Sequence, residues 1–170
     1  RRADFYQSIP VISGLKEAVE KKVIAQASKH FSFDFRLVFY DVTTLYFESF
    51  AEDEDVLDKE GNILDKGLKR NGFSKDRKFN QPQIVIGLIV TKEGFPVSYE
   101  VFEGNTFEGD TFIPVIAGFK QKHTISSLTV VADAAMISLD NIERLTKHEL
   151  PYIVGARIAN LKISEMKTII

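Results

Sequence analysis

Two aspartates of this 170-residue chain lie in apolar stretches, where a carboxylate is unexpected. Asp41 lies in the middle of Leu37–Phe47, which is rich in β-branched and aromatic residues, and Asp133 follows the apolar run Leu128–Ala132. These residue types predict two strands, and the nearly continuous apolar character of the first predicts a central strand that is covered on both faces. A carboxylate there is costly unless it is paired, hydrogen-bonded or bound to a cation. The pair is therefore the first candidate for chemistry.

Each aspartate also has a purely structural interpretation. Asp41 can pair with a lysine or arginine, and Asp133 can cap a turn at the end of its strand, which is a common role for Asp. Taken alone, Asp133 fits the turn better, whereas the two aspartates on neighbouring strands fit a metal site better. A zinc site has no support, because the chain has no Cys and its three histidines, His30, His123 and His148, are scattered.

The overall composition is that of a globular domain with a full core, with 44% hydrophobic and 27% charged residues. The absence of Cys excludes disulfides and fits a reducing cytoplasm. No apolar run approaches the roughly 20 residues of a membrane span. The first residues do not form a signal peptide. They also lack an initiator Met, so we expect a piece of a longer protein. The net charge of -2 neither indicates nor excludes a nucleic-acid partner, because charge distribution matters more than the sum.

Residues 48–82 form a charged insertion after the first predicted strand. Its first part, 48–60, is strongly acidic and its second part, 66–78, is strongly basic. A solvated loop and a surface that contacts nucleic-acid phosphates are equally good interpretations, and Phe73 and Phe79 among the cations favour the second. The candidate DNA-binding residues are Lys69, Arg70, Lys75, Arg77 and Lys78.

The remaining patterns predict helices and strands around this insertion. Residues 1–33 form an N-terminal helical segment, in which Leu15, Val19, Val23 and Ala27 recur every four residues and should pack on a neighbouring layer. Ile84–Val90 and Pro96–Phe102 read as a hairpin, and Ser138 begins a helix that is followed by the strand Pro151–Gly155. Between them, the helical stripe predicted to be core is Phe112, Val115, Ile116 and Phe119.

The resulting order is strand, insertion, hairpin, helix, strand, helix, strand. It predicts an α/β fold over residues 34–170, with a ribonuclease H-like mixed sheet that is flanked by helices and carries the charged insertion between its first and second strands. In that fold the first strand is central and the fourth lies beside it. Asp41 and Asp133 should therefore converge, although 92 positions separate them.

Four motifs carry a resemblance to a known family. Tyr40–Glu48, Gly72–Asp76, Gly104-Asn105 followed by Asp110, and Val130–Ala134 resemble the catalytic core of bacterial insertion-sequence transposases of the DDE type. The resemblance runs from about Leu37 to Arg157. It implies that Asp41 and Asp133 are the first two acids of the catalytic triad. The third, a Glu on a later helix, has no match around Glu165, so we expect it beyond Ile170 and expect this piece alone to be inactive.

The resemblance implies metal-dependent cleavage of DNA and strand transfer at insertion-sequence ends. Asp41 would bridge two Mg²⁺ ions, which Mn²⁺ can replace, and Asp133 would bind one of them. The implied partners are transposon-end DNA, target DNA and a second copy in a homodimer, with no membrane, in a bacterial cytoplasm at the nucleoid. Two alternatives remain: a ribonuclease H-like nuclease without strand transfer, and a non-catalytic remnant that binds DNA or protein.

Overall fold

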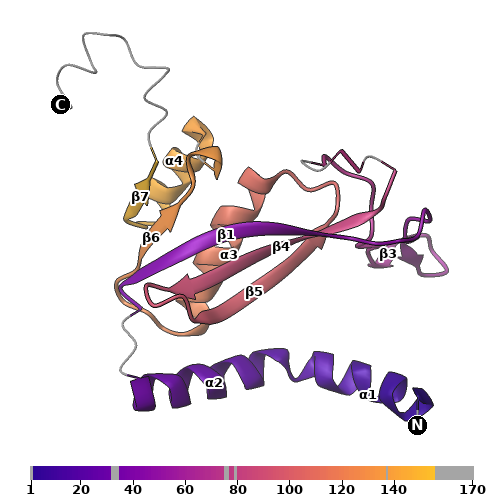
Figure 1. Ribbon diagram of the computed structural model, residues 1–170, viewed down its shortest axis with the longest axis horizontal. Coiled ribbons are helices and arrows are strands. Elements are labelled where there is room, and N and C mark those ends of the chain that lie inside the picture. Colours follow the sequence, from indigo (N-terminus) through magenta and orange to yellow (C-terminus); the bar gives the residue numbers. More distant parts are fainter. Residues whose placement is uncertain (1, 32–34, 75–76, 79, 137, 156–170) are drawn as a thin grey trace.

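A five-stranded mixed sheet forms the centre of the molecule (Figure 1). The structure is a computed structural model that describes residues 2–31, 35–74, 77–78, 80–136 and 138–155. The strand order is β5-β4-β1-β6-β7. The strands are β1 (Leu37–Tyr46), β4 (Gln83–Thr91), β5 (Pro96–Glu103), β6 (Thr129–Ala132) and β7 (Tyr152–Val154). The Asp41 strand is thus central, between the two neighbours that the sequence predicts.

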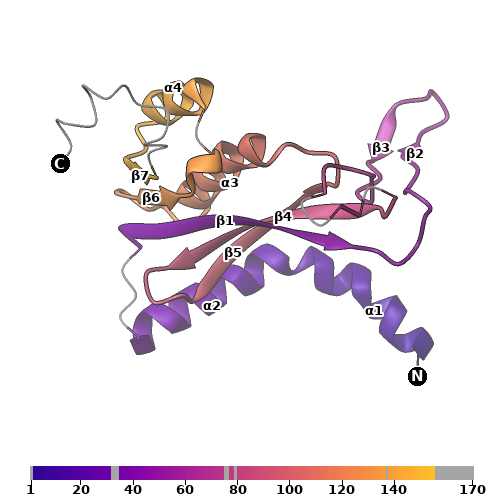
Figure 2. The same ribbon diagram turned by 45° about the horizontal axis from the view of Figure 1, so that its top comes forward.

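The pairing directions make this sheet ribonuclease H-like. β4 is antiparallel to β1 and to β5, so β1, β4 and β5 form a meander. β6 is parallel to β1, and β7 is parallel to β6. The crossovers are made by α3 (Glu108–Lys122) and α4 (Leu139–Lys147), which both lie on one side of the sheet (Figure 2). The predicted fold class is therefore confirmed.

The core lies between this face of the sheet and α3. All four residues of the stripe predicted to be core are buried: Phe112, Val115, Ile116 and Phe119. They belong to the same buried cluster as Val38, Ile89 and Val130 from the three central strands. Ser138 caps α4 as predicted, because its side chain accepts a hydrogen bond from the Asn141 N–H.

The second face of β1 is more open than its composition predicts. Burial alternates along the strand, and Phe39, Leu45 and Phe47 on this face are exposed, with Leu45 at 50%. The prediction of a strand covered on both faces is therefore wrong for the described residues. An apolar sequence shows that a face can be covered, but it does not show which element covers it. Asp41 lies on this open face and is exposed.

The N-terminal segment forms two consecutive helices, α1 (Arg2–Gly14) and α2 (Lys16–Phe31). α2 runs beside β5 at the edge of the sheet (Figure 1). Of the stripe predicted to pack, Ala27 is buried, but Leu15, Val19 and Val23 are exposed. That part of the prediction is wrong, because α2 buries Ile24 and Ala27 instead, and Ile24 belongs to the core cluster.

Three side chains make the main polar attachment of α2. The Lys16 ammonium donates to the Tyr99 carbonyl at 2.6 Å and pairs with Glu100 at 3.0 Å. Lys122 of α3 pairs with the other oxygen of Glu100 at 2.9 Å. Glu100 of β5 therefore joins α2 to α3. None of the helices within the described ranges is long and apolar enough to cross a membrane.

Candidate active site

Asp41 and Asp133 occupy matching places on adjacent parallel strands. The last register pair between β1 and β6 is Tyr40 with Ala132, and the two aspartates are the next residue on each strand. Neighbouring strands lie about 4.8 Å apart. The structure thus brings together the two aspartates that the sequence singles out, and both side chains are exposed.

The Asp41 carboxylate is held on the β6 side of its strand. Backbone groups of successive strand residues point to alternate sides, and the Arg36 carbonyl points to β6, where it accepts from the Thr129 N–H at 2.7 Å. The Val42 N–H therefore points to the same side. It donates to Asp41 Oδ1 at 2.9 Å. Because β6 ends at Ala132, this carboxylate lies where the edge of β1 becomes open.

The turn after Asp133 is fixed by a buried amide. The Met136 N–H donates to the Asp133 carbonyl at 3.0 Å and closes the short 3-10 turn Ala134–Met136. The side chain of Asn141, which is 2% exposed, donates to the carbonyls of Met136 and Gly109, both at 2.8 Å. Asn141 therefore ties this turn to the start of α3. In the sequence, Asn141 stands out only because it follows the helix cap Ser138. That position did not identify Asn141 as a residue that supports the site.

Tyr40 supports the site from the buried side of β1. Its hydroxyl shares a 2.6 Å hydrogen bond with Thr111 Oγ1 in α3. Burial raises the pKa of Tyr40 to about 12. The nearby charges of Asp41 and Glu108 also raise it, whereas the hydrogen bond with Thr111 lowers it. Tyr40 therefore stays neutral behind Asp41. The glycine at position 87 gives it room, because a Cβ there would collide with the Tyr40 hydroxyl.

The donor set fits a hard divalent cation in part. Two exposed carboxylates on adjacent strands offer oxygen ligands, and Mg²⁺ uses few carboxylates while keeping several waters. Within the described part of the chain, no group of three or more His, Cys, Asp or Glu side chains is placed to hold a metal ion. Glu165, the weak third-acid candidate, lies outside the described residues.

Two of the five candidate DNA-binding residues are paired inside the insertion. Lys69 pairs with Asp53 at 3.3 Å, and the Arg70 guanidinium contacts Asp55 and the Asp53 carbonyl. The Lys69 backbone N–H and its ammonium hold the pKa of Asp53 below its ordinary value. The acidic part of the insertion therefore pairs with two of the six cations of the basic part. This charge pairing, together with the two short strands β2 (Val56–Leu57) and β3 (Ile63–Asp65), was not visible in the sequence pattern.

The other candidate cations are free of such pairing or lie outside the described residues. Arg77 and Lys78 are exposed, and neither forms an ion pair with another described residue. The Lys78 ammonium lies 4.8 Å from the centroid of the Tyr46 ring, at the last residue of β1. Lys75 is outside the described residues. Both views show the insertion beyond the end of β1, away from β6 and β7 (Figures 1 and 2).

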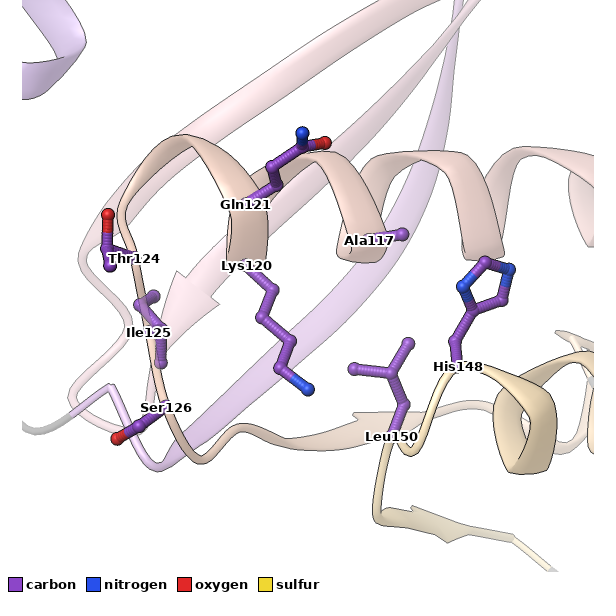
Figure 3. Close-up of a pocket in the computed structure, with 8 residues that line it drawn as sticks. All are labelled: Ala117, Lys120, Gln121, Thr124, Ile125, Ser126, His148 and Leu150. Atoms are coloured by element: carbon purple, nitrogen blue, oxygen red, sulfur yellow. The ribbon is translucent and has the colours of Figure 1, made fainter.

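A pocket of about 560 Å³ lies at the other end of β6 (Figure 3). It is lined by the last turns of α3, the segment before β6 and the segment between α4 and β7, including Lys120, Ser126 and His148. The Lys120 side chain extends between Ser126 and Leu150, and the His148 ring extends towards α3 (Figure 3). Because Ser126 precedes β6 and Asp133 follows it, this pocket is separate from the aspartates.

A mixed sheet of this order, with one carboxylate on each of two adjacent parallel strands, places the chain among the ribonuclease H-like catalytic cores. The model of the family described as "Transposase DDE domain" matches residues 33–168, and the chain belongs to this family. Membership of this family identifies the matched residues as part of a transposase catalytic core. No curated protein matches the sequence.

Among solved structures, complexes of the Mos1 transposase match this chain. The Mos1 transposase paired-end complex with left transposon end is 12% identical, with a TM-score of 0.44, over 84% of this chain and 42% of that one. The Mos1 mariner paired-end complex with Mn is 11% identical, with a TM-score of 0.43, over 83% and 41%. This chain thus spans about two fifths of the length of those chains.

Proposed function

We propose that this chain is part of the catalytic core of a transposase that cleaves and transfers DNA strands at the ends of a bacterial insertion sequence. Its partners would be transposon-end DNA, target DNA and a second copy in a homodimer, at the nucleoid in the cytoplasm. The observation that carries the proposal is the position of Asp41 and Asp133, one residue beyond the last register pair of β1 and β6. Membership of the DDE transposase family supports the reaction class.

In this proposal Asp41 and Asp133 hold Mg²⁺, or Mn²⁺ in its place. When bound, two such ions activate the attacking oxygen and stabilise the leaving oxygen of a phosphodiester. The chain itself supplies orientation. The Val42 N–H fixes one oxygen of Asp41, and Asn141 fixes the turn that follows Asp133. Neutral Tyr40 adds no negative charge behind the two carboxylates.

For the third carboxylate, the family resemblance supports a Glu outside the described residues. Among the candidate DNA contacts, Arg77 and Lys78 have the better support, because their charges are not compensated by described carboxylates. Lys69 and Arg70 would have to exchange Asp53 and Asp55 for phosphates before they contact DNA. Lys75 keeps its place in the proposal on sequence grounds alone.

Binding of Mn²⁺ by the chain tests the metal site directly. The electron paramagnetic resonance signal of free Mn²⁺ should fall as the wild-type chain is added. Asp41→Asn and Asp133→Asn should each weaken binding by at least tenfold, because each removes one of the two proposed carboxylate ligands. Asp140→Asn, which changes an exposed aspartate paired with Arg144 on α4, is the matched control and should bind like wild type. Wild-type binding by both site variants would contradict the metal site.

A strand-transfer assay separates the proposal from its nuclease alternative. A labelled duplex with a free 3′-hydroxyl is incubated with plasmid DNA, Mn²⁺ and the longest form of the protein that can be prepared. Joining of the label to plasmid supports a transposase, whereas nicking without joining supports a nuclease. Mn²⁺-bound protein that does neither supports the non-catalytic remnant.

A further inference from the structure

Phe73 is an exposed aromatic side chain on a backbone that is firmly held. Its side chain is 79% exposed. The Gln83 side chain, which is 2% exposed, donates from Nε2 to the Phe73 carbonyl at 3.1 Å and to the Gly104 carbonyl at 2.7 Å. The preceding residue, Gly72, is packed so closely that a Cβ there would collide with the Gly104 carbonyl.

The residue after Phe73 is held as well. Ser74 is buried, and its hydroxyl donates to the Tyr46 hydroxyl at 3.1 Å and accepts from the Lys78 N–H at 2.8 Å. Both neighbours of Phe73 are thus fixed to the end of β1 and to the hairpin strands. Exposing a ring on an ordered backbone adds nothing to the core, but it lowers the entropic cost of binding a partner.

The chemistry around Phe73 indicates the kind of partner. Lys78 lies against the Tyr46 ring at the end of β1, and Arg77 is its exposed neighbour. Tyr46 is five residues beyond Asp41, about 17 Å along the strand. An aromatic ring in the same segment as exposed cations that pair with no described carboxylate is a combination that binds single-stranded nucleic acid, because the ring stacks on a base while the cations contact phosphates.

We propose that Phe73 is a stacking site for an unpaired DNA base, with Arg77 and Lys78 on the adjoining phosphates. The inference rests on the proposed function and adds to it the recognition of a frayed or single-stranded DNA segment. A paired base keeps its faces covered by its neighbours, so a blunt duplex offers Phe73 nothing comparable.

Binding to two DNA probes tests this inference. One probe is a blunt duplex, and the other is the same duplex with a short single-stranded thymine tail. The wild-type chain should bind the tailed probe more tightly. Phe73→Ala should lower affinity for the tailed probe by roughly 5- to 100-fold, the range expected for one lost base stack, and leave affinity for the blunt probe unchanged. Phe50→Ala is the matched control, because Phe50 is also 79% exposed and lies in the same insertion.

Phe73→Trp gives a second readout that does not depend on stability. The chain has no Trp, so the new indole is its only tryptophan fluorophore. Its emission should be quenched by the tailed probe and not by the blunt one, with the preference for the tail retained. Equal quenching by both probes would overturn the inference. A Phe73→Ala variant that keeps the wild-type preference for the tail would also overturn it, although neither result would contradict DNA binding by the chain. Failure of the wild-type chain to bind either probe would instead count against the proposed function.

Discussion

Tyr40 links two layers of the molecule, because its backbone belongs to β1 and its hydroxyl reaches Thr111 in α3. The side chain crosses Gly87 of β4 on the way, and only a residue without a Cβ leaves room there. A glycine in the middle of a strand weakens the strand and often marks a place where another group approaches closely. Here the approaching group is the tyrosine next to Asp41, so Gly87 contributes indirectly to the geometry of the candidate site.

Gly87→Ala should therefore destabilise the protein. The added methyl must displace the buried Tyr40 hydroxyl from Thr111, and we expect the free energy of unfolding to fall by roughly 1–3 kcal/mol. Urea denaturation measures this change. Gly118→Ala is the control, because this glycine lies in α3 with no neighbouring atom within 4 Å of the place that a Cβ would take. It should be neutral or stabilising by up to about 1 kcal/mol. Equal stability of Gly87→Ala and wild type would show that the tyrosine can move freely.

At the scale of elements, Glu100 of β5 joins α2 and α3 through charge, in addition to the apolar contact that Ile24 of α2 makes with the core. Glu100 accepts from Lys16 of α2 and Lys122 of α3. Burial alone would raise the pKa of Glu100, but the hydrogen bonds from these two ammonium groups outweigh it, so its pKa lies below the ordinary 4.5. A carboxylate with a lowered pKa in the folded state stabilises the fold above its unfolded pKa. That contribution is lost as the pH falls through the lower folded-state value.

Glu100→Gln should accordingly reduce stability at neutral pH by an amount on the order of 1 kcal/mol, since the carboxylate is partly exposed to solvent. The difference from wild type should shrink below the ordinary pKa of 4.5 and disappear in stronger acid, where Glu100 is itself neutral. Urea denaturation at a series of pH values measures it. Glu93→Gln, which affects an exposed pair with Lys92 in the hairpin turn, should change little at any pH. If the stability difference between Glu100→Gln and wild type stayed constant at acidic pH, the loss of stability would come from changed packing and not from the lost charge.

The sequence predicts the elements of the sheet better than it predicts their surroundings. Alternating and continuous apolar runs mark all five strands, and their order alone places Asp41 beside Asp133. The charged insertion is different, because the pairing of Arg70 with Asp55 depends on a chain reversal that no local periodicity indicates. The exposure of Val19 and Val23 is a third case, since helical spacing shows an apolar stripe without showing whether anything covers it.

For the whole molecule, the distribution of charge matters more than the net charge of -2. The double variant Arg77→Ala/Lys78→Ala should weaken binding to unrelated DNA sequences alike. It should also reduce the slope of log affinity against log salt concentration by about two units at most, because each phosphate contact contributes about 0.9. Binding isotherms at several salt concentrations measure the slope. Lys92→Ala, in the turn between β4 and β5, is the control, and an unchanged slope in the double variant would remove these two cations from the DNA contact.

The parallel pairing of β1 with β6 also has a consequence for the order of folding. β4 and β5 are joined by a short turn and can pair early, whereas β6 must pair with a strand that lies far earlier in the chain, beyond the insertion, the hairpin and α3. Long-range closures of this kind are slow, because their entropic cost comes before the contacts that compensate it. We therefore expect Asp41 and Asp133 to come together late in folding. A cation that binds both aspartates favours the folded chain by mass action, so occupancy of this site would report that folding is complete.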